Sequence, residues 1–171
     1  MFVKRHGTEL ELYGRVLDVG DRLPVCTLHN SAGEPFDTSQ MHGWTLLSIM
    51  STISPGVCDA SLMAFHHVLR RYERLGVYAI VLAESTMLAN WCGNDGNEHL
   101  TLLADDEMNF GKATGLLIPN VAVLARSLYI IGPDARVRFR DIAAEQTELP
   151  DFGPALAFLD TVFGHYHKLQ N

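Results

Sequence analysis

Two apolar segments with a helical pattern between them constrain the fold of this chain most strongly. Residues 45–50 (TLLSIM) and 77–83 (VYAIVLA) are nearly continuous apolar runs, as is typical of strands buried on both faces of a sheet. Between them, apolar residues recur at helical spacing, with Ser54 as N-cap, Pro55 at the first helical position and Gly76 at the helix end. This unit predicts two parallel strands joined by a right-handed crossover.

The remaining segments complete an α/β layout. No repeat, low-complexity tract or linker interrupts residues 1–171, so we expect a single domain. We expect a central mixed sheet with helices on both faces. Further strands are expected at 9–13, 24–28, 100–103, 127–131 and 137–140, short helices at 87–91 and 109–114, and an amphipathic closing helix at 151–169.

Composition excludes several classes of protein. The 171 residues are 47% hydrophobic and 19% charged, which excludes a disordered chain. With 13 basic against 20 acidic residues, the net charge of −7 argues against nucleic acid or an acidic membrane as a partner. No apolar run is long enough to span a membrane, and the first residues have no secretory pattern. We therefore expect a cytoplasmic, reducing setting.

Cys58 is the residue with the clearest chemical potential. It follows a buried strand and lies in the first turn of the expected helix, where unpaired amides and the helix dipole favour a thiolate. A thiol of pKa about 8.5 is roughly 3% ionised at pH 7, whereas one near 6 is about 90% ionised. The position thus supports a reactive thiol, and a small buried apolar side chain remains the alternative.

The other two cysteines differ in context. Cys92 lies in a polar, glycine-rich turn 34 residues after Cys58, a spacing that argues against a thioredoxin-type Cys-x-x-Cys motif. It suits a resolving thiol that condenses with an oxidised Cys58, although an incidental surface thiol fits the spacing equally well. Cys26 lies in an expected strand, where packing is the simplest role.

Arginine and histidine side chains are further candidates for binding or catalysis. Arg126 interrupts the apolar run 121–131 and needs an anionic partner or a route to water, so a thiolate and a surface carboxylate are both candidates. The pairs His66–His67 and His165–His167 lack companion ligands at metal spacing and are interpreted as solvated helix faces. No glycine-rich phosphate loop is present, so neither a metal nor a cofactor is expected.

Three local motifs together resemble the bacterial thiol peroxidases, which are atypical two-cysteine peroxiredoxins with a thioredoxin-like fold. Residues 51–58 (STISPGVC) resemble the family's Pro-Ser-Ile-Asp-Thr-Gly-Val-Cys, and residues 91–96 (WCGNDG) resemble its Phe-Cys-Gly-Ala-Glu-Gly at the same distance. Residues 124–126 (LAR) are similar to its Ala-Ala-Arg segment. The likeness extends over nearly the whole chain, including an N-terminal β-hairpin.

The resemblance implies a reaction and a role for each matching residue. Cys58 would be the peroxidatic thiolate, Cys92 the resolving thiol, and Arg126 the group that holds the thiolate and the negative charge developing on the leaving oxygen. Members reduce hydroperoxides, often organic ones, form an intramolecular disulfide and are recycled by thioredoxin. They are typically homodimers.

The chain departs from the family at two substrate-binding positions. In the family motif Pro-x-x-x-Thr-x-x-Cys, the proline and threonine positions hold Ser51 and Pro55 here. Pro55 has neither a hydroxyl nor an amide proton, and losing one such contact can cost about 10²–10³ in rate. Ser51 and Ser54 are the candidate replacements, while Asp59 adds a negative charge that raises the pKa of the neighbouring thiol.

Two functions therefore compete. The first is a peroxidase with Cys58 and Cys92 as the catalytic pair, which the joint presence of both cysteines and Arg126 favours. The second is a peroxidase-impaired homologue that acts as a redox sensor or protein-binding module, which Ser51 and Pro55 favour. A thiol–disulfide oxidoreductase is weakened by the absence of Cys-x-x-Cys.

Overall fold

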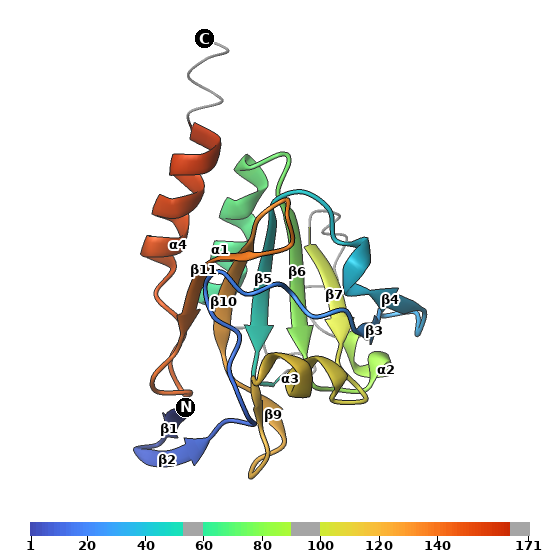
Figure 1. Ribbon diagram of the computed structural model, residues 1–171, viewed down its shortest axis with the longest axis vertical. Coiled ribbons are helices and arrows are strands. Elements are labelled where there is room, and N and C mark those ends of the chain that lie inside the picture. The colour runs from blue at the N-terminus through green and yellow to red at the C-terminus, as the bar shows by residue number, and fades with distance from the viewer. Residues whose placement is uncertain (53–59, 90–99, 165–171) are drawn as a thin grey trace.

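A seven-stranded mixed sheet forms the centre of the computed structural model, which describes residues 1–52, 60–89 and 100–164 (Figure 1). Its strands are β3 (Thr27–His29), β4 (Pro35–Asp37), β5 (Thr45–Met50), β6 (Gly76–Val81), β7 (Leu100–Ala104), β10 (Ser127–Ile131) and β11 (Val137–Ile142). They lie in the order β11-β10-β5-β6-β7-β3-β4, with β5, β6 and β7 parallel and the other pairs antiparallel. The α/β class and the mixed sheet are confirmed.

Four α-helices and two small strand pairs surround this sheet in the described part of the chain. The helices are α1 (Ala60–Val68), α2 (Ser85–Leu88), α3 (Asn109–Thr114) and α4 (Phe152–Leu159), and a π-helical turn at Asp160–Gly164 continues the last. The expected N-terminal hairpin is present as β1 (Phe2–Arg5) and β2 (Thr8–Glu11), and β8 (Leu117–Ile118) pairs with β9 (Val123–Leu124). None of the helices described here is long and apolar enough to cross a membrane.

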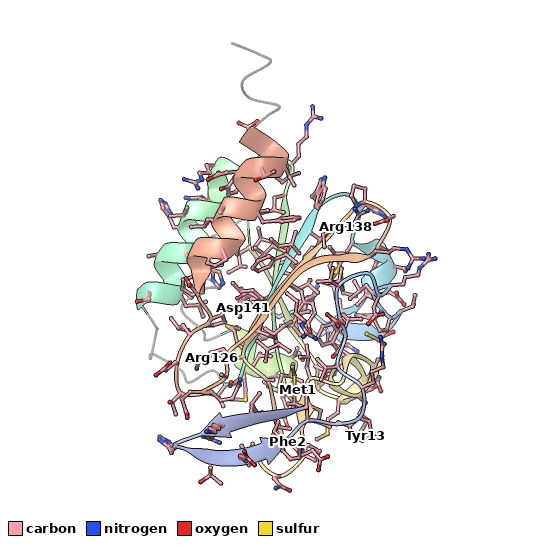
Figure 2. The ribbon with its side chains drawn as sticks, turned by 60° about the vertical axis from the view of Figure 1, so that its left-hand side comes forward. Met1, Phe2, Tyr13, Arg126, Arg138 and Asp141 are labelled. Carbon is pink, nitrogen blue, oxygen red and sulfur yellow. The ribbon has the colours of Figure 1, made fainter. Side chains whose placement is uncertain are left out.

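The central strand β5 is buried on both faces, which explains its continuous apolar sequence. Leu46 and Met50 belong to the core cluster that includes side chains of α1 and α4, whereas Leu47 and Ile49 belong to the cluster on the other face. Figures 1 and 2 show α1 and α4 side by side on the same face. Each large apolar side chain buried in this way contributes about 1.5–3 kcal/mol of transfer free energy.

The strand–helix–strand prediction is confirmed in its topology and wrong at the helix end. Strand β5 pairs in parallel with β6, from Thr45 opposite Gly76 to Met50 opposite Val81. The helix does not reach Gly76, because α1 ends at Val68 and a 3₁₀ turn follows to residue 71. The amide of Gly76 donates to the carbonyl of Trp44 at 2.9 Å, so this glycine begins a strand and does not end a helix. The expected N-cap lies outside the described residues.

The other expected elements differ mainly in their bounds. The helix predicted at 109–114 is confirmed at both ends, and α4 begins after Asp151, whose side chain accepts a hydrogen bond from the amide of Gly153 at 3.0 Å. The strand expected at 24–28 begins only at Thr27. The reason is that the hydroxyl of Thr38 donates to the carbonyl of Pro24 and accepts from the amide of Cys26, which takes this backbone out of the ladder.

Candidate active site

A pocket of about 230 Å³ opens where β5 ends, next to the N-terminal hairpin. Its polar lining comes from the hairpin, the end of β5, the start of β10 and the segment after β11. Its apolar lining comes from the region of β8 and β9. The polar residues are Arg5, His6, Ser51, Thr52, Arg126, Gln146 and Thr147, and the apolar ones are Ile118, Val121 and Val123.

Strand pairing brings two of the sequence-predicted site residues into this pocket. Strand β10 runs antiparallel to β5 with Ser127 opposite Ile49, so Arg126 and Ser51 both lie at the same end of the pair. Both line the pocket, although they are far apart in sequence. The other predicted site residues, Cys58, Cys92, Ser54 and Pro55, lie outside the described residues.

A buried glutamine links these two residues. Gln146 is only 6% exposed, and its side-chain oxygen accepts hydrogen bonds from the amide of Arg126 and, at 3.3 Å, from the hydroxyl of Ser51. Its side-chain nitrogen donates to the carbonyl of Ala143 at 2.7 Å. Because both ends of the amide have partners, burying it avoids the penalty of an unpaired polar group.

The same segment holds the hairpin in place. The amide of Gln146 donates to the carbonyl of Lys4 at 2.7 Å, and the amide of Lys4 donates to the carbonyl of Ala144 at 2.8 Å. The hairpin turn has left-handed backbone at His6 and Gly7, as a two-residue hairpin turn requires. The amides of His6 and Gly7 donate to the Glu145 carboxylate at 2.8 and 3.2 Å. The hairpin is therefore fixed against one wall of the pocket.

Glu145 is ionised, which suits a side chain that accepts hydrogen bonds from the hairpin turn. Partial desolvation opposes its charge, but hydrogen bonds from Gly7, Thr147 and His6 outweigh that effect and hold the pKa of Glu145 below its ordinary value. The carboxylate is thus ionised at neutral pH, and its oxygens are occupied by the hairpin turn and by Thr147.

Arg126 is held by its backbone on both sides. Its amide donates to Gln146, and its carbonyl accepts from the amide of Ala143 at 3.0 Å. The side chain is half-buried and lines the pocket, and Figure 2 shows it between the body of the protein and the hairpin. A fixed backbone limits the positions open to the guanidinium, which is the preorganisation that a charge-stabilising group needs.

Sequence reasoning did not identify Gln146 or Arg5 as site residues. Gln146 stands in a polar stretch with no periodicity, and its two partners at the pocket, Arg126 and Ser51, are 20 and 95 positions away. Arg5 is one basic residue near the chain's first residues, with no motif around it. Neither carries a local signal that would have singled it out.

The interpretation of His66 as a solvated residue is wrong. This side chain is only 2% exposed, and its Nε2 lies 2.9 Å from the hydroxyl of Ser48 on β5. Its Nδ1 has no hydrogen-bond partner in the described structure. Desolvation lowers the pKa of His66 to about 4, because burial disfavours the charged ring. A polar residue faces the sheet here because Ser48 supplies a partner for one ring nitrogen.

The packing role expected for Cys26 is confirmed. The side chain is half-buried and packs against the core cluster that contains Leu28 and Phe110. Burial, together with the charge of nearby Asp105, raises the pKa of the Cys26 thiol to about 11. It therefore remains a protonated thiol at neutral pH and is a poor nucleophile.

Comparison with known proteins agrees with this fold and with the sequence motifs. The model of the AhpC/TSA family matches residues 19–140. Thiol peroxidase of Bacillus subtilis (strain 168) is 30% identical over 148 residues, covering 85% of this chain and 89% of that protein. Thiol peroxidase of Halalkalibacterium halodurans is 28% identical over 152 residues, covering 88% of this chain and 92% of that protein.

Solved structures support the fold independently. A peroxiredoxin-like protein from Aquifex aeolicus superposes with a TM-score of 0.83 at 19% identity, over 94% of this chain and 96% of the other. Thiol peroxidase from Chromobacterium violaceum superposes with a TM-score of 0.79 at 19% identity, with the same coverage. The peroxiredoxin form of the thioredoxin-like fold is confirmed. With the family model matching most of the chain and thiol peroxidases matching nearly all of it, the chain belongs to the AhpC/TSA family and, within it, to the bacterial thiol peroxidases.

Proposed function

We propose that this thiol peroxidase reduces hydroperoxides with Cys58 as the peroxidatic thiolate and Cys92 as the resolving thiol. The observation that carries the proposal is the pocket at the end of β5, where Ser51, Thr52 and Arg126 meet. Ser51 and Thr52 come just before the segment that contains Cys58 in the sequence. Family membership supplies the class of reaction, a thiol-dependent reduction of peroxide.

The proposed reaction has three steps. The Cys58 thiolate attacks the terminal oxygen of the hydroperoxide, the O–O bond breaks, and the alkoxide leaves as an alcohol after taking up a proton. The resulting sulfenic acid is attacked by the Cys92 thiol, which forms the disulfide and releases water. A thioredoxin-type dithiol then reduces that disulfide and is itself oxidised.

Arg126 is the proposed electrostatic catalyst. A guanidinium beside the pocket favours the thiolate over the thiol and stabilises the negative charge that develops on the leaving oxygen. The buried Gln146 supports this role, because it accepts a hydrogen bond from the Arg126 amide and so fixes the backbone from which the Arg126 side chain reaches the pocket. No metal or organic cofactor has a part in these steps.

Of the two serines that could replace the threonine hydroxyl missing at Pro55, Ser54 is the better candidate. The Ser51 hydroxyl donates its proton to Gln146, so in this arrangement it has lone pairs but no proton for a thiolate or peroxide. Ser54 is then the hydroxyl that we propose takes over the threonine's contact. On this basis Ser54→Ala lowers kcat/KM more than Ser51→Ala, and Pro55→Thr raises it.

Trapping the oxidised thiols tests the central proposal. The fully reduced protein receives one equivalent of cumene hydroperoxide, is quenched over time with an alkylating agent, and is analysed by intact and peptide mass. We expect rapid formation of a Cys58–Cys92 disulfide, no oxidation in Cys58→Ser, and a lasting Cys58 sulfenic acid in Cys92→Ser. Cys26→Ser is the matched control and behaves as the unaltered protein.

The same experiment can contradict the proposal. If Cys58 is oxidised no faster than a free thiol such as cysteine, the peroxidatic role fails, and a redox sensor or binding module becomes the better account. If Cys58 is oxidised rapidly but pairs with Cys26, the peroxidatic role stands and the resolving role of Cys92 fails.

We further propose a homodimer located in the cytoplasm, as the likeness to the thiol peroxidases suggests. Light scattering after size-exclusion chromatography of the reduced protein measures the assembly directly. A mass near 19 kDa, the mass of one chain, contradicts the dimer, whereas twice that mass supports it.

A further inference from the structure

The charged residues that line the active-site pocket share one sign. Among the described lining residues, Arg5 and Arg126 are cationic and none is acidic. This contrasts with the whole chain, which carries 20 acidic against 13 basic residues. Arg126 is already assigned to the reacting atoms, so the pocket has a second cation with no role in the proposed reaction.

Arg5 is directed toward this pocket by the pleat of its strand. In β1, Arg5 lies two residues after Val3 and therefore on the same face, and Val3 is buried against the protein body. Arg5 pairs with Thr8 across the hairpin, directly before the turn that Glu145 holds. The fold thus presents Arg5 at the exposed rim of the pocket.

The Arg5 guanidinium is available for an external anion. Among the described residues, no carboxylate lies within ion-pair distance of Arg5. Glu145, which is bonded to the adjacent turn, has its oxygens occupied by the amides of His6 and Gly7 and by Thr147. A guanidinium with five donors in a planar fork matches a carboxylate or phosphate group in geometry as well as charge.

The rest of the pocket suits a short apolar skeleton. Ile118, Val121 and Val123 form its apolar wall, and Ile118 belongs to the core. The volume of about 230 Å³ is below the 300–1,000 Å³ that is usual for drug-sized ligands. A small organic hydroperoxide fits these dimensions better than a bulky one does.

We propose that the preferred substrate class is a short organic hydroperoxide that carries an anionic group, with Arg5 as the specificity-determining residue. The apolar wall takes the carbon skeleton, Arg5 pairs with the anion at the rim, and the hydroperoxide end points toward Arg126. This inference rests on the proposed peroxidase function and deepens it by naming the feature of the substrate that the site selects.

A matched substrate pair tests the inference. Cumene hydroperoxide and its para-carboxylate have the same tertiary hydroperoxide group and differ only in a remote charge. For the reduced full-length protein at low ionic strength, we expect kcat/KM to be about fivefold higher for the carboxylate, as one charge-assisted contact at an exposed site provides. The preference shrinks as salt is added, because the contact is exposed to solvent.

Two variants locate the effect. Arg5→Gln brings the preference close to one by lowering kcat/KM for the carboxylate alone, and Arg5→Glu reverses it. Lys4→Gln is the matched control, because it removes the same charge from the neighbouring residue, whose side chain lines a different pocket with Glu9 and Glu145. Lys4→Gln keeps the preference.

Several outcomes would overturn the inference. One is an equal kcat/KM for both hydroperoxides in the unaltered protein. Another is an Arg5→Gln variant that loses rate equally on both, and a third is a Lys4→Gln variant that loses the preference to the same extent. If the protein reduces neither hydroperoxide, the peroxidase proposal fails by itself. Calorimetric binding of the carboxylated cumyl alcohol, tighter to the unaltered protein than to Arg5→Gln, then decides the inference separately.

Discussion

Two serines at β5 show two ways in which this protein buries polar groups. Ser48 lies within the strand and bonds to His66 of α1, whereas Ser51 lies just beyond its end and bonds to Gln146. Both glutamine and histidine are nearly inaccessible, at 6% and 2% exposure. The two contacts lie only three residues apart along one segment, yet their consequences differ.

The difference lies in how completely each buried group is satisfied. The side-chain oxygen of Gln146 accepts two hydrogen bonds and its side-chain nitrogen donates one. By contrast, Nδ1 of His66 has no hydrogen-bond partner in the described structure. An unpaired buried polar atom costs about 1–3 kcal/mol, and a buried titratable ring adds a dependence on pH. The polar contact at the pocket is therefore rigid, whereas the one under α1 makes the fold sensitive to acid.

The largest expected effect is the acid sensitivity that His66 confers. The pKa of His66 in the folded state is about 4, below the ordinary value of 6.5, so the unfolded chain binds the proton more readily. Folding stability from this group is complete above pH 6.5 and is lost as the pH falls toward 4. Between about pH 7 and pH 4.5, we expect the free energy of unfolding to fall by roughly 2 kcal/mol through this residue alone.

The measurement compares urea unfolding of the unaltered protein with that of His66→Leu at both pH values. The variant lacks the His66 share of the acid loss, so the stability difference between the two proteins changes with pH. His67→Leu serves as the control, because His67 is an exposed neighbour on the same helix. Parallel pH profiles for the unaltered protein and His66→Leu would contradict the prediction.

The next largest effect is expected at Gln146, whose buried side-chain amide has hydrogen-bond partners at both its oxygen and its nitrogen. Gln146→Met keeps the length of the side chain but removes the acceptor for the Arg126 amide and the donor to the Ala143 carbonyl. We expect a loss of about 1–3 kcal/mol in the free energy of unfolding. We also expect kcat/KM to fall about tenfold, since small displacements of a charge-stabilising group cost rate.

The same change at Gln40 separates stability from positioning. Gln40 is exposed, and its side chain accepts one hydrogen bond from the amide of Asp37 at 2.8 Å. The backbone contacts of Arg126 are with Gln146 and Ala143, which are not part of this turn. Gln40→Met lowers stability slightly and leaves kcat/KM unchanged. A Gln146→Met protein with full activity would show that the glutamine holds the fold only.

The smallest expected effect is the difference in stability between the Ser48→Ala and Ser51→Ala variants. Ser48→Ala leaves both ring nitrogens of His66 without a partner among the described groups, and we expect a cost of about 1–2 kcal/mol. Ser51→Ala removes only the 3.3 Å bond, and Gln146 keeps Arg126 as its other donor, so the cost is below about 1 kcal/mol. Chemical denaturation of the two variants at pH 7 measures the difference. Equal losses would show that the two contacts are equivalent.

Much of the fold was predictable because it follows from local patterns. Residues 45–50 are apolar on both sides of the strand, and β5 is indeed buried on both faces. The helix at 109–114 and the strands β10 and β11 also lie where they were expected, although β11 continues to Ile142. The end of α1 was not predictable, since Gly76 fits a helix end and a strand start equally well, and its hydrogen bond to Trp44 comes from the neighbouring segment.

The candidate site was predictable only in part. Arg126 and Ser51 were identified from their sequence contexts, and both line the pocket. Gln146 and Arg5 were missed. Gln146 matters through contacts with Arg126 and Ser51, which are 20 and 95 positions away. Arg5 matters through the hairpin pairing that brings it to the same pocket. His66 was assigned to the wrong face, since a helical pattern alone does not reveal that β5 offers Ser48 as a partner.

The sequence by itself determined the α/β class, the parallel strand–helix–strand unit and the likeness to the thiol peroxidases. These depend on apolar periodicity and on short motifs, which neighbouring residues express together. Only the tertiary structure decided that Gln146 joins Arg126 to Ser51 and that Arg5 shares their pocket. The physical reason is that hydrogen bonds and charges act over a few ångströms of space, and the distance between two residues is set by how the strands pair.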